Sequence, residues 1–432
     1  MSIQKRYVRY VSQNILGMMG ISLYILADTF FISMAEGADG ITALNLVLPL
    51  YSVIYAIGAM VGVGSAIRFA IFRAKGESEA EYYFSNAIMW LIMLSVPFII
   101  GGVWFPDAIM RLLGADAAIV EVGVPYTGTF LVFAPFFMLN YVFTAFVRND
   151  TDPALAMAAT LTSSLCNIVL DYVFMFPLGM GMTGAALATG LSPVIGIGIC
   201  SIHFLKKTNT IRFVWQRPSV RRWVTSCQLG VSAFIGELSS GVTTAVYNWL
   251  ILEIAGNVGV AAYGVVANTA LVATSMFNGV ANGSQPLISE SYGKGDEASV
   301  RKVLKLSLGT AVAIAVVLLG VVVLFAEPII AVFNSENSLQ LKEYAMVGIK
   351  LYFVGFLFAG MNIAGCGYLS AVGRAKEAFV TSISRGVAAI VVCAIVLAML
   401  FGMTGVWLSF AAAELVTFIL LGMILVNSLW RR

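Results

Sequence analysis

The sequence predicts an all-α polytopic membrane protein in which twelve transmembrane helices form two parallel six-helix repeats. The chain of 432 residues is 60% hydrophobic and 11% charged, with a mean hydropathy of +0.92, whereas about a quarter of the residues of a soluble domain are charged. Apolar runs repeatedly exceed the roughly 20 residues that a helix needs to cross a bilayer. Short motifs also return about 220 residues later, which indicates a duplication.

The apolar runs between polar breaks define the predicted spans. Helices are expected because hydrocarbon offers no hydrogen bonds to an exposed irregular backbone. The N-terminal MSIQKRYVRY leads directly into the first span, so we expect no separate signal peptide. Bends are expected at prolines inside spans, which free a carbonyl, namely Pro49, Pro97, Pro135, Pro193 and Pro286. The spans are 11–34, 42–70, 83–105, 120–147, 154–176, 184–205, 224–252, 260–290, 303–326, 344–370, 377–400 and 405–429.

Basic residues are concentrated at the termini and in alternate connections between spans. Only Arg111, Lys342 and Lys350 fall in the other set of connections. Since basic loops stay in the cytoplasm, both termini are predicted to be cytoplasmic. The net charge of +3 comes mainly from these loops, so we expect no nucleic-acid partner.

A basic connector at 206–222, with six basic residues and no acid, separates six predicted spans from six. We therefore expect an N-terminal lobe over residues 1–215 and a C-terminal lobe over 216–432. Motifs of the two halves overlay at near-constant offsets, and an even number of helices in each half makes the copies parallel. The overlays are GMTGAAL (181–187) on GMTGVWL (402–408), RAKGE (73–77) on YGKGD (292–296), GVGSAI (62–67) on ANGSQP (281–286), and Gly37 and Gly40 on Gly256 and Gly259.

Acidic residues within the spans are the candidate functional residues, because each costs about 2.5–3.5 kcal/mol at mid-membrane. A rise of about 1.5 Å per residue places Asp28 roughly 12 Å, Asp171 roughly 9 Å and Thr189 roughly 8 Å from the outer ends of their helices. Asn167 precedes Asp171 by one helical turn, as Tyr24 precedes Asp28. The acids within or at the ends of spans are Asp28, Asp171, Glu237, Glu290 and Glu414.

The similar depths predict a cation-binding cage in the outer half of the N-terminal lobe, formed by Asp28, Asp171, Asn167, Thr189 and Tyr24. Two dry carboxylates cannot both stay charged, so either one holds a proton or a cation lies between them. Na⁺ would suit an all-oxygen metal site of Asp28, Asp171, Asn167 and Thr189, whereas H⁺ needs only the two acids. The alternative is two unrelated polar residues, each bonded locally. The equivalent positions of the second half, Tyr247, Ala388, Val392 and Phe410, hold no such cage.

The other acids carry separate expectations. Glu237 lies deep in a span and could attract a cationic substrate or bind a second proton. Glu414 is expected to be structural, and Glu290 is expected to pair with Lys294 or face solvent. His203 is expected to have a structural or surface role, and the five scattered cysteines predict neither a disulfide framework nor a metal site.

Several motifs and function classes are excluded. Gly179–Gly184 matches GxGxxG but lies between two membrane helices instead of following a strand, and no GxxxxGK[ST] occurs. We therefore expect no nucleotide, no cofactor other than a coupling ion, and no direct use of ATP. Neither a nucleophile–base pair nor an HExxH-like motif is present, so an enzyme is not expected.

The order and spacing of YILADTFF (24–31), NIVLD (167–171), GMTGAALAT (181–189) and QPLISESYGKG (285–295) resemble the multidrug and toxic compound extrusion (MATE) family over essentially the whole chain. The resemblance implies a V-shaped pair of lobes that open alternately to each side. It also implies efflux of amphipathic, often cationic compounds driven by inward H⁺ or Na⁺. The family's coupling residues fall on Tyr24, Asp28, Asn167, Asp171 and Thr189.

The chain departs from the family pattern in two places. Its first helix has no proline and offers Asn14, Gly17 and Gly20 instead, which argues against a proline-dependent bend. No acid occurs between Glu343 and Glu377, where some members carry a coupling carboxylate.

The function predicted from these observations is secondary active antiport. A monomer in the plasma membrane, the inner membrane of a bacterium, would exchange amphipathic cationic drugs for H⁺ or Na⁺. The alternatives are a flippase for lipid-linked oligosaccharides, which would need cationic residues in the helix interiors, and a channel or receptor.

Overall fold

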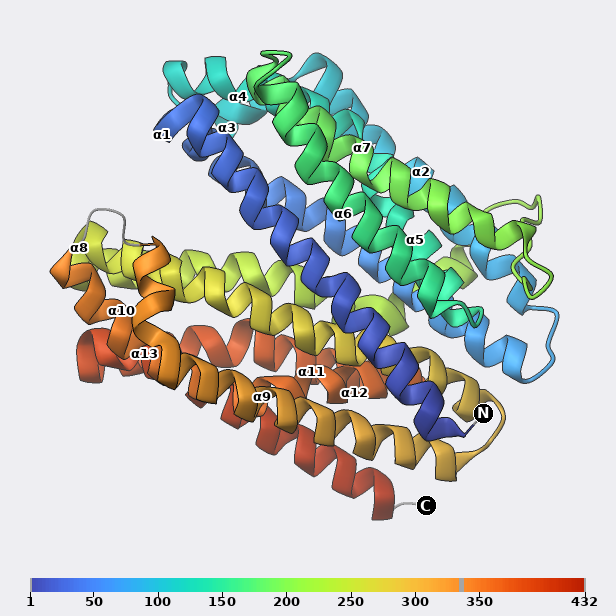
Figure 1. Cartoon of the computed structure of the whole chain (residues 1–432). Coiled ribbons are helices and arrows are strands. Elements are labelled where there is room, and N and C mark those ends of the chain that lie inside the picture. The colour runs from blue at the N-terminus through green and yellow to red at the C-terminus, as the bar shows by residue number, and fades with distance from the viewer. Residues whose placement is uncertain (1, 334–337, 431–432) are drawn as a thin grey trace. The chain divides into compact units, whose positions relative to one another are not determined.

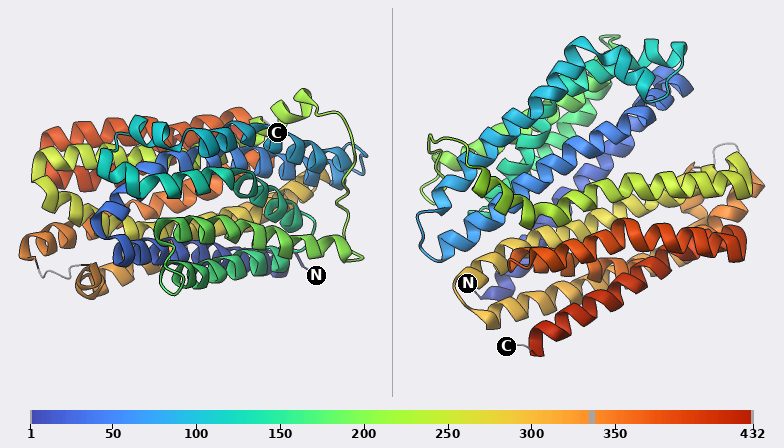
Figure 2. Two further views of the ribbon diagram at one scale, coloured as in Figure 1. Left: turned by 90° about the horizontal axis from the view of Figure 1, so that it is seen from above. Right: turned by 180° about the vertical axis from the view of Figure 1, so that it is seen from behind.

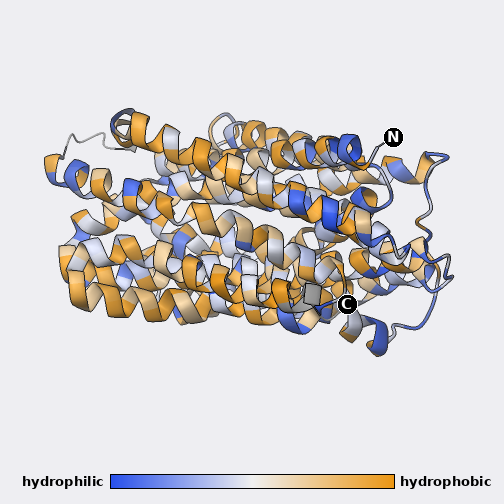
Figure 3. Cartoon of the chain, turned by 90° about the horizontal axis from the view of Figure 1, so that it is seen from below, coloured by the Kyte–Doolittle hydropathy of each residue, from blue (hydrophilic) through white to orange (hydrophobic). Residues whose placement is uncertain are grey.

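The computed structural model describes residues 2–333 and 338–430, and these fold into helices without a strand (Figures 1 and 2). Hydrophilic residues lie mainly at helix ends and in connections, while the helix bodies are mostly hydrophobic (Figure 3). The α-helices are α1 (Ile3–Ala74), α2 (Ala80–Trp104), α3 (Pro106–Leu112), α4 (Ala117–Val132), α5 (Ala134–Asn149), α6 (Pro153–Met175), α7 (Gly181–Ser201), α8 (Val220–Gly293), α9 (Glu297–Phe333), α10 (Leu339–Val354), α11 (Phe356–Ala371), α12 (Ala375–Ile383) and α13 (Ala389–Trp430). A 3₁₀ turn, η1 (Ile202–Leu205), follows α7, and a π-helical turn, η2 (Ser384–Ala388), joins α12 to α13.

The prediction of twelve membrane-spanning helices is confirmed within the described residues. Eight segments are long and apolar enough to cross a membrane, and two bent pairs, α4 with α5 and α10 with α11, bring the number to ten. Non-helical glycines, Gly256 and Gly402, interrupt two of the eight segments. Each interruption leaves a membrane-length helix on both sides, and counting these sides separately gives twelve spans.

The breaks recur in the two halves of the chain, as a duplication requires. Of the ten described positions with φ in the left-handed region, eight form four pairs about 220 residues apart. Left-handed backbone suits glycine because it has no Cβ. The bent pairs also match, with angles of 45° for α4–α5 and 43° for α10–α11. The paired positions are Gly37 and Gly256, Gly76 and Gly295, Thr151 and Gly373, and Gly181 and Gly402.

The two matching bends have different local causes. The α4–α5 bend lies at Phe133, and Pro135 follows in the first turn of α5, as the sequence predicts. The α10–α11 bend lies at Gly355 and has no proline. A Cβ on Gly355 would lie 2.4 Å from Phe410 Cδ1, so glycine permits a close approach there.

The short helix α3 was not predicted, since its seven residues lie in what reads as a polar break.

The described residues pack as two compact units. The first unit comprises Leu16–Glu237 and Ser289–Asp296, and the second comprises the remaining described residues. The first unit therefore continues beyond the connector to Glu237, while the boundary at residues 215 and 216 stays a prediction. A Cβ on Gly230 would lie 1.8 Å from the Met60 carbonyl oxygen, and one on Gly64 would lie 2.0 Å from that of Ser226. Backbone contact between α1 and α8 thus holds the start of α8 in the first unit.

The glycines near the start of α1 serve packing. The only non-helical backbone inside α1 is at Gly37, so Gly17 and Gly20 do not bend it. A Cβ on Gly20 would lie 2.8 Å from Leu161 Cδ2 of α6. Small residues on α1 therefore let it approach α6, the helix that carries Asn167 and Asp171.

Candidate functional site

The structure brings Asp28, Asn167, Asp171 and Thr189 together from α1, α6 and α7 of the first unit. All four are buried, with 8% of Asp28 and none of Asp171 exposed. In the amide orientation that satisfies both neighbours, Asn167 Nδ2 donates to Asp171 Oδ2 (3.2 Å) and its oxygen accepts from the Thr189 backbone N–H (3.3 Å). The Asp28 and Asp171 carboxylates also interact electrostatically. The predicted proximity is therefore present, and the role of these residues as cation ligands stays a prediction.

Three oxygen atoms at this place are buried without a hydrogen-bond partner among the described residues: Asp28 Oδ1, Asp171 Oδ1 and Thr189 Oγ1. Burying a polar atom without a partner costs free energy, and burying a charged one costs more. A proton on one carboxylate, or a cation among the oxygens, would remove much of this cost. The cluster is therefore chemically suited to take up a small cation.

A group of tyrosines adjoins the two carboxylates, and most of it was missed in the sequence. Half-buried Tyr24, one turn before Asp28 on α1, is hydrogen-bonded to Tyr55. The hydroxyls of Tyr51 and Tyr126 are 2.5 Å apart, and Tyr126 interacts electrostatically with Asp28. The i, i+4 spacing of Tyr51 and Tyr55 on one helix face was the signal available in the sequence.

The tyrosine group continues to Glu237 on α8. The Tyr141 hydroxyl of α5 donates to Glu237 Oε1 (2.8 Å), and the rings of Tyr55 and Tyr141 lie edge to face with centroids 6.0 Å apart. Tyr24 interacts electrostatically with Glu237 as well as with Asp28. Glu237 thus belongs to the same unit and the same polar group as the two aspartates, while its role in substrate binding stays a prediction.

The second unit replaces this polar group with aromatic packing. Tyr247, the counterpart of Asp28, is fully buried and its hydroxyl lies 2.8 Å from Ser409 Oγ. Phe410, the counterpart of Thr189, stacks on Tyr352 with ring centroids 4.2 Å apart. Val392, the counterpart of Asp171, is 59% exposed. The carboxylates are therefore specific to the first unit.

The other two acids have partners. Glu414 is buried in the second unit, where Arg385 Nε lies 2.8 Å from Oε1 and Asn362 Nδ2 lies 2.8 Å from Oε2. Lys294 Nζ lies 2.5 Å from Glu290 Oε1, which confirms the expected pair. Arg385 belongs to η2, and no sequence signal foretold this π-helical turn.

No group of three or more His, Cys, Asp or Glu side chains among residues 2–333 and 338–430 could hold a metal ion. The predicted Na⁺ ligands are of another kind, with two carboxylates, a hydroxyl and an amide. The Asn167 oxygen already accepts from Thr189, so three of the four predicted ligands retain an unpaired oxygen. These oxygens can bind a proton without rearrangement, whereas a Na⁺ ion held by all four predicted ligands would also need the Asn167 oxygen.

The chain is similar to known transport proteins over nearly its whole length. It is 27% identical to the multidrug export protein MepA of Staphylococcus saprophyticus over 421 residues, covering 96% of this chain and 91% of that one. It is 28% identical to MepA of Staphylococcus aureus over 402 residues, covering 91% and 86%.

Solved structures share the fold. An outward-facing multidrug resistance MATE family transporter of the MOP superfamily has a TM-score of 0.92 at 23% identity, covering 100% of this chain and 98% of that one. A MOP superfamily transporter from Pyrococcus furiosus has a TM-score of 0.89 at 23% identity, covering 97% and 94%.

The MatE family model matches residues 14–173 and again residues 233–395. The two matches begin about 220 residues apart, as the internal duplication predicts. The first contains Asp28, Asn167 and Asp171, while Thr189 and His203 lie outside both. Because the two matches together cover most of the sequence, the chain belongs to the MatE family.

Proposed function

We propose that the chain is a secondary active antiporter that exports amphipathic, cationic organic compounds in exchange for an inward H⁺ or Na⁺. The observation that most directly supports this proposal is the set of three unpaired buried oxygens on Asp28, Asp171 and Thr189. The names of the MepA relatives support multidrug export. The basic connections support an orientation with both termini in the cytoplasm of a plasma membrane, the inner membrane in a bacterium. We propose that the monomer is sufficient, because all the coupling residues lie in one unit.

The coupling ion neutralises the aspartate pair. Two charged carboxylates repel each other in a dry site, so the site is costly to close while it is empty. An ion from the outer side removes that cost and favours the conformation that releases substrate outward. Loss of the ion to the cytoplasm restores the charge and resets the site for the next compound.

Of the two candidate ions, H⁺ is favoured. The Asn167 oxygen, one of the four predicted Na⁺ ligands, already accepts a hydrogen bond from Thr189, so a Na⁺ ion would have to share that oxygen with the Thr189 N–H. A proton needs only a carboxylate oxygen, and Asp28 and Asp171 each have one unpaired.

Glu237 is proposed to attract the organic cation. Its carboxylate is half-buried and flanked by Tyr141, which in turn contacts Tyr55. A carboxylate beside aromatic rings suits a lipophilic cation, because the charge and the ring faces both attract it. Its electrostatic interaction with Tyr24 offers a way for bound substrate and bound ion to influence each other.

The test is efflux of a fluorescent organic cation from proteoliposomes under an imposed pH gradient and, separately, an imposed Na⁺ gradient. Asp28→Asn and Asp171→Asn should each abolish gradient-driven efflux, since neither amide can take up the proton. Glu253→Gln, at an exposed acid, is the matched control and should transport normally. Wild-type rates in both aspartate variants would remove the pair from the mechanism. Unchanged efflux after an ionophore collapses both gradients would point to a channel.

A further inference from the structure

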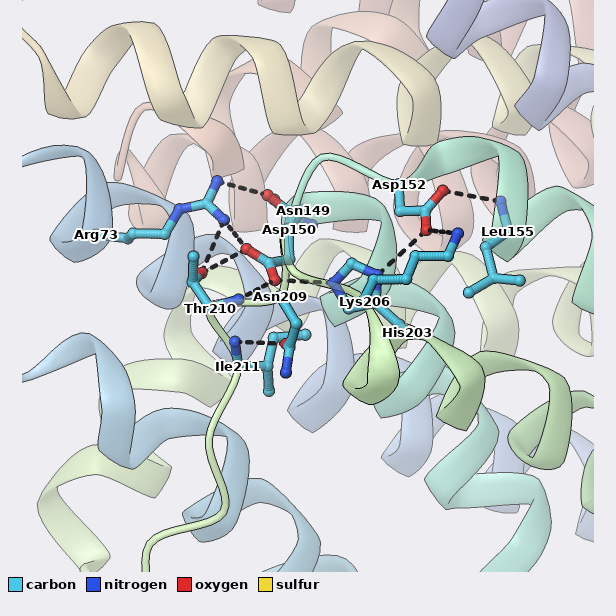
Figure 4. Close-up of polar contacts among 10 residues, drawn as sticks. All are labelled: Arg73, Asn149, Asp150, Asp152, Leu155, His203, Lys206, Asn209, Thr210 and Ile211. Atoms are coloured by element: carbon cyan, nitrogen blue, oxygen red, sulfur yellow. Dashed lines mark hydrogen bonds and ion pairs between the residues drawn. The ribbon is translucent and has the colours of Figure 1, made fainter.

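A second polar cluster lies in the first unit where η1 meets the turn between α5 and α6 (Figure 4). The carboxylate of Asp150 is its centre, with a side chain only 1% exposed. It pairs with Arg73 at the end of α1 and accepts from the backbone N–H of Thr210 (2.7 Å), which belongs to the long connector. Three segments far apart in the sequence therefore meet at one buried carboxylate.

His203 is enclosed between two carboxylates of this cluster. Its side chain is fully buried, with Nε2 2.8 Å from Asp150 Oδ2 and Nδ1 3.2 Å from Asp152 Oδ2. Ionised carboxylates only accept hydrogen bonds, so both ring nitrogens must carry a proton to satisfy both contacts. Only the imidazolium form does this, and its deprotonation sets a lone pair against a carboxylate oxygen.

Among the basic groups of this cluster, only the histidine changes its charge within the physiological pH range. Arg73 pairs with Asp150, and Lys206 Nζ lies 2.6 Å from Asp152 Oδ2. Arg148 also lies nearby, where it interacts with the Cys200 thiol one turn before His203. Arginine and lysine stay charged across the physiological range, whereas histidine ordinarily titrates within it.

The two aspartates stay ionised over the same range. Burial by itself raises the pKa of Asp150, but hydrogen bonds from His203 and Thr210 and the charge of Arg73 outweigh it and hold that pKa below its ordinary value. Burial acts the same way on Asp152, and hydrogen bonds from Lys206 and His203 hold its pKa low as well.

The cluster is not a requirement of the fold. Thr151, between the two aspartates, has φ of 71°, a conformation that is strained for a β-branched residue. Its counterpart in the second half is Gly373, with φ of 79°. At the same offset of 222, Val372 stands for Asp150 and Arg374 for Asp152, and Ile424 stands for His203 at an offset of 221. A strained turn with two carboxylates has thus been kept in one copy, where an unstrained turn without them serves in the other.

The cluster connects to the proposed coupling site through two helices. Asp152 caps α6, accepting from the Leu155 backbone N–H (3.3 Å), and His203 directly follows α7. These helices carry Asn167, Asp171 and Thr189 in their halves away from the cluster. A change in the contacts that hold the start of α6 and the end of α7 can therefore shift the residues of the proposed coupling site.

We propose that Asp150, Asp152 and His203 form a proton-dependent latch that fastens the start of the connector, residues 206–213, and slows transport when the cytoplasm is acidic. An acidic cytoplasm protonates His203 and closes the latch. A more alkaline cytoplasm opens it. Closure thus restrains further proton import when the cytoplasm is already acidic. Later connector residues have other anchors, since Val214 N–H donates to Ser85 (2.7 Å) and Ser219 N–H donates to Asn86 (2.7 Å).

The effect on transport rests on the proposed function and on the orientation with a cytoplasmic connector, whereas the release of the connector rests on neither. The first experiment therefore measures release alone. The purified full chain is digested briefly with trypsin over a series of pH values, and cleavage after Lys206, Lys207 and Arg212 is quantified against cleavage after Lys294 as an internal reference.

Wild-type connector cleavage, relative to the reference, should rise severalfold as the pH is raised above the range in which histidine ordinarily titrates, because both flanking carboxylates favour the imidazolium form. His203→Gln should give the high ratio at every pH, because glutamine carries no positive charge and its amide oxygen can only accept hydrogen bonds. Asp107→Asn, which removes an exposed carboxylate of α3 outside the cluster, should behave like wild type. A ratio independent of pH in wild type, or the same pH dependence in His203→Gln, would overturn the latch.

If His203→Gln does not fold, Asp152→Asn tests the latch instead. It keeps the contacts of Asp150 and removes the need for a proton on Nδ1, so its cleavage should also lose the pH dependence. Efflux is then compared at a constant pH gradient and different absolute pH values, and the wild type alone should slow on acidification. Efflux that slows equally in Asp152→Asn would refute control of transport, whereas no gradient-driven efflux in any variant would be a failure of the proposed function.

Discussion

Replacing Thr189 with valine separates the two candidate coupling ions. The Thr189 side chain is 3% exposed, and its hydroxyl oxygen is buried without a partner in the described part of the chain. Threonine and valine have nearly the same shape, so the substitution removes a polar atom and leaves the packing of α7 in place. A proton on a carboxylate does not need this hydroxyl, whereas a Na⁺ cage does.

The size of the effect follows from the missing hydrogen bond. An unsatisfied buried hydroxyl costs about 1–3 kcal/mol, so Thr189→Val should raise the free energy of unfolding by about 1 kcal/mol. Thr127→Val is the matched control, because the Thr127 hydroxyl is equally buried but donates to Met110 Sδ (3.0 Å). That variant should lose about 1 kcal/mol instead.

The assay combines unfolding in mild detergent with efflux from proteoliposomes. Under proton coupling, Thr189→Val should be more stable than wild type and should transport at a similar rate under a pH gradient. Under sodium coupling, loss of a ligand worth about 1.5–3 kcal/mol would reduce efflux more than about tenfold. A variant that is destabilised like Thr127→Val would show that the hydroxyl has a partner, and the argument from unpaired oxygens would fail.

Three further outcomes test the packing and charges. In thermal unfolding, Gly230→Ala should destabilise the first unit by about 3 kcal/mol or more, because its Cβ would overlap a backbone carbonyl. The control Gly236→Ala has open space around its Cβ, so it should be neutral or stabilising by up to about 1 kcal/mol. Glu414→Gln should cost about 3 kcal/mol by leaving Arg385 without its buried anion, and replacing both by apolar residues should recover most of that in the same unfolding assay. The pKa of Asp152 is raised by burial but lowered further by its basic neighbours, so its stabilising effect is complete above the unfolded value of about 3.9 and is lost as the pH falls through the lowered pKa. Asp152→Asn should therefore flatten the acid limb of a stability–pH curve, and an unchanged limb would contradict this.

Hydropathy and depth along the helices predicted much of the fold and the centre of the site. The spans follow from composition alone, and the distance of Asp28 and Asp171 from their helix ends was enough to place them at a similar level. Asn167 followed from helical spacing. These features depend on local sequence or on the membrane, so they can be read without knowledge of packing.

The remaining features depend on contacts between distant segments. Glu237 meets Tyr141 only because α8 packs on α1 through Gly230, and neither side chain carries a periodic signal. His203 read as an ordinary structural histidine, because its partners come from a turn about 50 residues earlier in the chain. The bend at Gly355 has no proline and is visible only through its counterpart at Phe133.

The duplication distinguishes residues that serve the shared fold from the residues proposed to serve coupling. Left-handed glycines and matching bends recur in both halves, so the backbone breaks belong to the shared fold. The carboxylates of Asp28 and Asp171 do not recur, and aromatic side chains fill the equivalent interior. The buried acid Glu414 is also confined to one copy, but Arg385 neutralises it, whereas Asp28 and Asp171 interact with each other and each keeps an unpaired buried oxygen. An unneutralised pair confined to one unit is what coupling to a single ion site would produce, and changes at this pair should therefore affect transport far more than folding.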